Sequence, residues 1–464
     1  MMAVRYPNSH ARLWVGALAL LVAGISGHVV TPNGPRATGA TVGLSNSAEH
    51  KPRSNTAEQA GRGYRPATTP FDRPADGPRN YTTGPFFRAR DHATLYHGPG
   101  RRMPEPTNIE TVVIGYFGPD DPKHPRFGQM WLAAQMAIEE ANAAGGYRGK
   151  PFTLVPAWSK DPWGTGIAQL AKMVFADKVW AIIGGVDGPS THLAEQICVK
   201  ARLALISPGC TDKTVNLTNV PWMFSCLPGD HLQAPVLAKE IARSTKAQPF
   251  VVVSTDDHDS RLFAAELLQA FKEHRLAPTF HFQWDKDPSV IGALVSCVTT
   301  TDAQTIVILA GPLDSGQLTT AIRASGFEGR FFGGPAMGHH AFPGVAEEEA
   351  GRVVFPLLFD ATGARPFARE FERRHNQQPD YLAAAAYDAA RLTTVAINKA
   401  GLNRARIGDA VRALSPWKGV SGTITWDAVG ANTRDVPLGT ITGGYPAPLA
   451  PCEVPRAPDG LTSR

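Results

Sequence analysis

The sequence contains little cysteine and lacks the motifs of common catalytic and nucleotide-binding sites. Its 464 residues include five cysteines, which form no CxxC pair, and neither an HExxH nor a GxSxG motif occurs. Residues 145–150 approach a phosphate-binding loop, but the glycine spacing is short and Pro151 stands where a Ser or Thr must bind magnesium. Residues 184–188 lack the GxGxxG spacing of a dinucleotide site. We therefore predict that the chain is not an enzyme and needs no cofactor.

Clustered metal ligands are equally scarce. His339 and His340 are adjacent, and neighbouring side chains on a regular element cannot both face one metal. No other zinc motif supports them. No metal site is predicted.

The chain also lacks a strong excess of either charge. Its formal net charge is +5, which is small for this length, and the basic residues are spread out. We therefore expect no nucleic-acid partner and no attraction to a membrane surface.

No apolar run is long enough to span a bilayer comfortably. Residues 13–25 are apolar, follow Arg5 and Arg12, and are followed by small residues. This pattern predicts an export signal over residues 1–27, with an uncleaved membrane anchor as the alternative. No cysteine follows the run, so a lipoprotein acylation site is absent. We expect a soluble protein that is periplasmic or otherwise exported after signal removal.

Two segments lack the periodicity of a packed element. Residues 28–108 are rich in Pro, Gly and Arg and predict a disordered linker, and residues 443–464 predict a disordered tail. The remaining length exceeds what one apolar core usually organises, which indicates two core-bearing units.

The cysteines leave two possibilities open. Cys198 and Cys226 flank the predicted strand at 203–207, and an exported protein can oxidise such a pair. The alternative is that they are free buried thiols that behave as small apolar side chains.

Short apolar runs alternate with amphipathic stretches along most of the chain. The predicted strands lie at 111–117, 152–158, 179–183, 203–207, 250–254, 279–283, 305–309 and 330–332, with helices between them. This alternation predicts parallel sheets covered by helices on both faces. Two longer helices follow, at 366–375 and 380–400, and a closing pair of strands is expected at 420–427 and 436–441.

Several motifs occur together in one order between residues 109 and 442. They are Ile-Gly-Tyr-Phe-Gly-Pro at 114–119, Ala-Ile-Glu-Glu-Ala-Asn-Ala-Ala-Gly-Gly at 137–146, Val-Trp-Ala-Ile-Ile-Gly-Gly at 179–185, Ser-Pro-Gly at 207–209 and Ala-Tyr-Asp-Ala at 386–389. In these motifs the chain resembles the type I periplasmic solute-binding proteins of the leucine/isoleucine/valine-binding branch.

The resemblance implies a fold of two Rossmann-like α/β lobes joined by a three-strand hinge. Lobe 1 would comprise residues 109–228 plus 354–417, and lobe 2 residues 229–353 plus 418–442. Proteins of this kind capture a small polar solute, such as an amino acid, an amide or a short carboxylate, between the lobes and deliver it to an ABC permease in the membrane. A ligand-sensing receptor module that signals to a membrane partner is the alternative.

The predicted solute site begins with the loop that follows the strand at 179–183. Asp187, Gly188, Ser190 and Thr191 lie where this strand gives way to a helix. Free backbone N–H groups at a helix start favour an anionic group such as a carboxylate. The alternative is that Ser190 only caps its own helix.

The resemblance implies two further ligand contacts, and at two positions this sequence differs from the family pattern. It assigns a backbone contact to Gly209 and a side-chain contact to Thr211. A serine expected near position 188 is replaced by Gly188, and a glutamate expected to pair with a ligand ammonium is replaced by Ala336. Either another carboxylate binds the ammonium, or the ligand has none.

Specificity is predicted to reside in the loop after the strand at 250–254. Asp257, His258 and Asp259 offer charge-assisted hydrogen bonds to a polar or zwitterionic ligand. A solvated loop in which Asp259 caps the next helix is the alternative. Trp163, and Trp158 near it, are expected either to form a wall of the cleft or to pack in the core.

Overall fold

The computed structural model describes residues 93–158, 162–245, 248–287, 289 and 291–449. The predicted export signal, the linker as far as residue 92 and the tail from residue 450 lie outside this range. In the described part of the chain, no helix has both the length and the apolar character required to cross a membrane.

Five of the described strands form a parallel sheet in lobe 1. They are β1 (Val112–Phe117), β2 (Phe152–Ala157), β3 (Ile182–Gly184), β4 (Leu205–Ser207) and β5 (Met223–Ser225), in the order β2-β1-β3-β4-β5. Successive side chains alternate between its faces, so Ile182 and Ile183 lie in different apolar clusters. The strands are apolar throughout because helices cover both faces.

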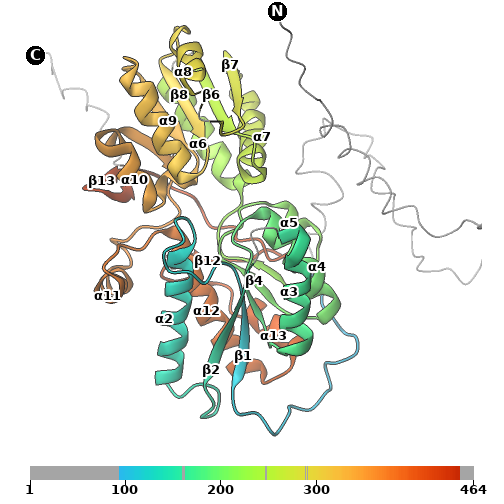
Figure 1. Cartoon of the computed structure of the whole chain (residues 1–464). Coiled ribbons are helices and arrows are strands. Elements are labelled where there is room, and N and C mark those ends of the chain that lie inside the picture. The colour runs from blue at the N-terminus through green and yellow to red at the C-terminus, as the bar shows by residue number, and fades with distance from the viewer. Residues whose placement is uncertain (1–92, 159–161, 246–247, 288, 290, 450–464) are drawn as a thin grey trace, which may run out of the picture. The chain divides into compact units, whose positions relative to one another are not determined.

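The helices of lobe 1 come from distant parts of the chain. They are α2 (Gly128–Ala143), α3 (Ile167–Ala171, between π-helical turns Pro162–Gly166 and Lys172–Ala176), α4 (Gly188–Ala201), α5 (Thr214–Leu217), α11 (Arg365–His375), α12 (Tyr381–Ala400) and α13 (Arg404–Arg412). Figure 1 shows α2 beside α12, and these two helices share one apolar cluster with the sheet. The chain therefore returns to lobe 1 after building lobe 2.

Lobe 2 repeats this architecture with an extension. Its strands are β6 (Phe250–Thr255), β7 (Phe280–Trp284), β8 (Thr305–Leu309), β9 (Arg330–Gly333), β10 (Val353–Pro356), β13 (Leu438–Thr442) and β14 (Tyr445–Pro448). Within the described residues their order is β14-β13-β10-β9-β8-β6-β7, parallel from β7 to β10 and antiparallel beyond. The covering elements are α6 (Asp230–Thr245), α7 (His258–Glu273), α8 (Ile291–Thr299), α9 (Pro312–Ala324), α10 (Ala341–Ala346) and the 3-10 turns Pro335–Gly338 and Glu347–Arg352.

The predicted lobe boundaries need correction. The predicted boundary at 353/354 falls inside β10, yet the whole strand pairs with β9 and β13 in lobe 2. Residues 418–442 are predicted in lobe 2, and of this segment β13 does pair there. However, β11 (Trp417–Gly419) pairs with β12 (Gly422–Ile424), and this hairpin packs on lobe 1. The expected pairing of 420–427 with 436–441 does not form, because the second segment pairs with β10 and β14 instead.

Both predicted disordered segments extend too far. The end of the linker, residues 93–108, packs on lobe 1, where Arg101 Nη1 lies 2.5 Å from Asp409 Oδ2. The tail begins later than residue 443, because β14 pairs with β13 in antiparallel register. Local composition did not indicate either contact, since both depend on partners distant in sequence.

The four described cysteines are all free. Cys198 and Cys226 are buried in separate apolar clusters on opposite faces of the lobe 1 sheet, so the disulfide alternative is wrong. Burial raises the pKa of both thiols, which makes them inert apolar side chains.

Candidate functional site

A cavity of about 60 Å³ lies between the two lobes. Its lining comprises Arg126, Gly209, Thr211, Asp230, Asp257, Asp259, Ser260, Phe263, Leu309, Ala310, Gly311, Gly334, Pro335, Ala336 and Tyr381. Most of these residues follow the carboxyl ends of β4, β6, β8 and β9. Ligands of open parallel sheets bind at this edge, because the connecting loops gather there.

Asp230 is the most unusual group in the cavity. It is the first residue of α6 and is buried, and its Oδ1 has no hydrogen-bond partner among the described residues. Burial raises the pKa of Asp230 well above the usual carboxyl value, although the Thr211 hydroxyl acts in the opposite direction. A buried carboxyl with one unpaired oxygen is costly unless a ligand supplies the partner.

Two further carboxylates and one guanidinium complete the charged lining. Burial, together with the nearby Asp187, raises the pKa of Asp259 to about 6. Arg126 Nη2 lies 3.9 Å from Asp259 Oδ2. Asp257 lies 3.4 Å from Lys286 Nζ. The cavity therefore contains acidic groups in excess of its one arginine.

Apolar side chains restrict the remaining space. Phe263 and Leu309 are buried, and Pro335 and Ala336 come from the turn after β9. Tyr381, the first residue of α12, is buried on the lobe 1 side. The arrangement suits a small molecule with both polar and apolar parts.

Of the ten predicted site residues, four line the cavity, namely Gly209, Thr211, Asp257 and Asp259. They reach it because the loops after β4 and β6 meet between the lobes. Asp257 also caps α7 by accepting a hydrogen bond from Ser260 N at 3.1 Å. The predicted cap Asp259 is therefore replaced by Asp257, which leaves Asp259 available to the cavity.

The side chains at the start of α4 form hydrogen bonds within the first turn of that helix. Asp187 is the N-cap and accepts a hydrogen bond from Ser190 N at 2.9 Å, while Ser190 Oγ accepts one from Val186 N at 3.0 Å. Thr191 Oγ1 donates to Asp187 O at 2.7 Å. None of these three predicted residues is among those that line the cavity. The alternative of helix capping describes the loop better, with Asp187 as the cap.

Gly188 makes a contact between the lobes. Its N–H donates to Asp259 Oδ1 at 3.0 Å, and a Cβ at this position would lie only 2.7 Å from that oxygen. The glycine expected to offer a backbone donor to the ligand thus offers it to Asp259.

Three other predicted positions have different surroundings. His258 lies beside the cavity residues, but its Nε2 is 3.0 Å from Asp212 Oδ2. Trp163 belongs to the turn Pro162–Gly166, and its side chain lies outside what the structure describes. Trp158 packs in the lobe 1 core, with its ring centroid 5.5 Å from that of Phe117.

The lobes also meet at the start of α12. His339 Nε2 and His340 Nδ1 lie 3.1 and 2.7 Å from the same oxygen of Asp380. The two adjacent side chains can face one carboxylate because they lie in irregular backbone between a 3-10 turn and α10, where the restriction on a regular element does not apply.

Sequence reasoning missed Arg126, Asp230, Phe263 and Tyr381. Each is at or near a helix start, and nothing in its local sequence distinguishes it from other helix residues. Asp230 and Tyr381 each follow a crossing between the lobes, so only a known hinge position could have indicated them.

Comparisons with known proteins all indicate the same class of binding protein. Residues 111–445 match a family described as periplasmic binding protein. An amino acid binding protein of Pseudomonas aeruginosa is 29% identical over 227 residues, which cover 49% of this chain and 54% of that relative. The leucine-, isoleucine-, valine-, threonine- and alanine-binding protein of the same organism is 23% identical and covers 69% of this chain and 87% of its own length.

A solved structure with the same fold is the branched-chain amino acid transporter substrate-binding protein LivJ of Streptococcus pneumoniae in complex with isoleucine. It has a TM-score of 0.66 at 23% identity, and the match covers 72% of this chain and 97% of that one. This likeness shows that the fold is the one expected from the sequence.

Proposed function

Because this chain belongs to the periplasmic binding protein family, we propose that it captures a small amino acid between its lobes and presents it to an ABC permease. The single observation that carries the choice of ligand is Asp230, a buried carboxyl in the cavity with an oxygen that lacks a described partner.

An ammonium group is the partner that Asp230 requires. A positively charged donor would pair with the unpaired oxygen and lower the raised pKa of Asp230, which favours the ionised carboxyl. An anionic ligand would instead add repulsion to an already acidic lining. Asp259 lies in the same cavity and adds to this preference. These aspartates take the role that a glutamate would have at the position of Ala336.

The carboxylate of an amino acid has its own donors. Arg126 supplies a guanidinium, whose fork of N–H groups suits a carboxylate. Gly209 and Thr211 line the same cavity from the loop after β4. Phe263 and Leu309 offer an apolar surface to a short side chain.

Capture by both lobes explains how binding would be signalled to a permease. The proposed ligand groups come from lobe 1 at Thr211 and from lobe 2 at Asp259. A ligand that touches both lobes favours the arrangement in which they meet, by as much as its affinities for the two arrangements differ.

Isothermal titration calorimetry of the full chain with L-amino acids, their amides and short carboxylates tests the proposal. We expect one ligand per chain, with amino acids preferred over carboxylates that lack the amino group. Asp230→Asn should weaken binding about 10- to 100-fold, since a charge-assisted hydrogen bond contributes about 1.5–3 kcal/mol.

Asp256→Asn is the matched control. Asp256 is exposed and does not line the cavity, so this variant should bind like the wild type. Binding of amino acids that is equal in Asp230→Asn and wild type would remove Asp230 from the site. Preference for carboxylates without an amino group would contradict the proposed ligand class.

A further inference from the structure

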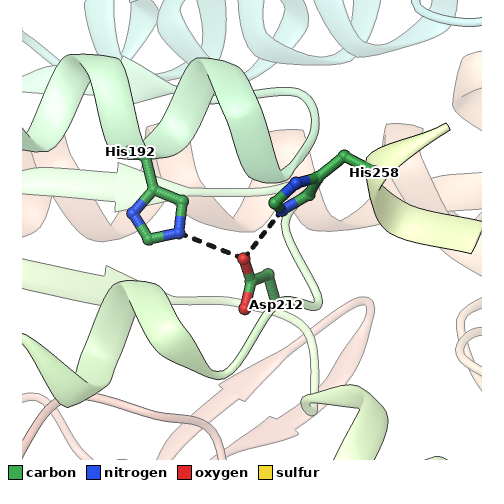
Figure 2. A group of neighbouring side chains, drawn as sticks. All are labelled: His192, Asp212 and His258. Atoms are coloured by element: carbon green, nitrogen blue, oxygen red, sulfur yellow. Dashed lines mark hydrogen bonds and ion pairs between the residues drawn. The ribbon is translucent and has the colours of Figure 1, made fainter. Parts of the chain in front are cut away.

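Two histidines and an aspartate converge where the lobes meet, outside the solute cavity. His192 lies on α4, Asp212 follows β4, and His258 is the first residue of α7 (Figure 2). The Nε2 atoms of His192 and His258 lie 3.1 and 3.0 Å from the same Oδ2 of Asp212. The three atoms that can bind a metal all lie within 4.8 Å of one another.

We propose that His192, Asp212 and His258 bind one divalent transition-metal ion of the zinc class, which bridges the two lobes. Zinc is bound by histidine nitrogen and carboxylate oxygen at about 2.0–2.2 Å in tetrahedral geometry. Ligand atoms at that distance are about 3.3 Å apart. The two nitrogen–oxygen separations, 3.1 and 3.0 Å, differ from this value by only a few tenths of an ångström. The two histidine nitrogens lie within 4.8 Å of each other, so rotation of the rings would complete the set.

The carboxylate of Asp212 is prepared for this role by its own loop. Its Oδ1 accepts hydrogen bonds from Thr214 N at 2.8 Å and Thr214 Oγ1 at 2.7 Å. These bonds leave Oδ2 directed at the two rings, as Figure 2 shows.

The surroundings of the rings also suit a metal. His192 Nδ1 lies 3.9 Å from Glu195 Oε2, so a carboxylate is near the second ring nitrogen but beyond hydrogen-bond distance. The side chains of His192 and His258 are 26% and 35% exposed, so an ion and its water ligand can reach them. Thr214 Oγ1, 2.9 Å from His192 Nε2, would keep its bond to Asp212 when an ion occupies the site.

The cluster of His339, His340 and Asp380 is less suited to a metal. His339 Nε2 already lies 2.9 Å from Arg126 O, and its Nδ1 accepts a hydrogen bond from Ala341 N at 3.1 Å. The His339 side chain is 1% exposed. With both ring nitrogens in use, this histidine has no lone pair to offer.

An ion bound by His192, Asp212 and His258 would link the two lobes. Two of its ligands belong to lobe 1 and the third, His258, to lobe 2. It would therefore stabilise the arrangement in which the lobes touch, and by linkage it would raise the affinity for any ligand that prefers the same arrangement.

Titration calorimetry of the EDTA-treated full chain with ZnCl2 provides the test. We expect one Zn²⁺ per chain, with affinity reduced at least tenfold in His192→Gln and in His258→Gln. His274→Gln, at an exposed position just after α7, is the matched control and should bind zinc like the wild type. His340→Gln should also bind normally.

Cobalt gives a second readout that does not depend on affinity. Co²⁺ bound by these three side chains should show the visible absorption of a tetrahedral centre, and this absorption should be lost in both cluster variants. The proposal is overturned if the chain binds no Zn²⁺, if His192→Gln and His258→Gln bind it as the wild type does, or if only His340→Gln is impaired. Circular dichroism verifies that each variant is folded.

Discussion

At the scale of single residues, the site differs from the expected one in where its negative charge lies. The resemblance placed a glutamate at the position now held by Ala336, and the structure has a buried aspartate, Asp230, in the same cavity. The carboxyl group thus comes from the start of α6 and not from the turn after β9.

His339 provides a residue-scale prediction about pH. Burial lowers its pKa to about 4, although Asp380 acts in the opposite direction, so the folded protein keeps the ring neutral at pH values where the unfolded chain protonates it. The unfolded state therefore binds more protons between about pH 6.5 and 4, and stability must fall as the pH is lowered through this range.

Thermal unfolding of wild type and His339→Gln at pH 7 and pH 5 measures this effect. The loss of melting temperature on acidification should be smaller in the variant by a few degrees, because glutamine does not titrate and still offers a donor to Arg126 O. His274→Gln, with an exposed ring, should behave like the wild type. An identical loss in wild type and His339→Gln would contradict the assignment.

At the scale of elements, α12 makes contacts with lobe 2 and with the hairpin of β11 and β12 that its own sequence does not indicate. Its N-cap Asp380 accepts hydrogen bonds from Leu382 N and Ala383 N and meets His340 of lobe 2. Eight residues later, Asp388 accepts bonds from Val420 N at 2.9 Å and Ser421 N at 2.8 Å. This helix therefore fixes both a lobe contact and the hairpin of β11 and β12.

Asp388→Ala should destabilise the protein by about 3 kcal/mol. Asp388 is fully buried, and its removal leaves two backbone N–H groups and the Ser421 hydroxyl without an acceptor. Urea unfolding measures the change, with a lower midpoint at an unchanged slope. Asp302→Ala, at an exposed aspartate, is the control. A midpoint equal to that of the control would show that the hairpin does not depend on Asp388.

At the scale of the whole molecule, the two lobes use one strand order twice. In lobe 1 it is β2-β1-β3-β4-β5, and the parallel part of lobe 2 is β7-β6-β8-β9-β10. This arrangement directs the loops of both sheets to a shared cavity. Family membership confirms the prediction that the chain is a binding protein and not an enzyme.

The contacts at the ends of the described chain give a prediction about its minimal fragment. A fragment of residues 109–442 should melt at a lower temperature than one of residues 93–449. The shorter fragment lacks the salt bridge of Arg101, the hydrogen bond from Tyr147 Oη to Glu105 Oε2 at 2.6 Å, and the pairing of β14. Fragments 93–442 and 109–449 separate the contribution of residues 93–108 from that of residues 443–449. Equal melting temperatures for all four would show that both segments are dispensable.

Much of the architecture could be predicted because buried parallel strands are apolar throughout and alternate with amphipathic helices. β5 was missed because Met223–Ser225 is short and lacks a β-branched residue. α13 was missed because it begins only three residues after Gly401, the stop of α12, and β14 was missed because it follows Gly443 and Gly444, which resemble the end of a domain. Of the residues predicted from strand ends, Thr211 and Asp259 line the cavity, whereas Ser190 has a local partner and does not line it. Contact of Thr211 and Asp259 with a ligand stays a prediction.

The amino-acid sequence by itself determined the two α/β units, their family and the loops from which the cavity is built, because these depend on local periodicity and on motifs in a preserved order. Only the tertiary structure decided which carboxylates line the cavity and which histidines meet across the lobes. Asp230, Arg126 and His258 acquire their surroundings from residues far away in the chain, and burial, pairing and pKa depend on those surroundings.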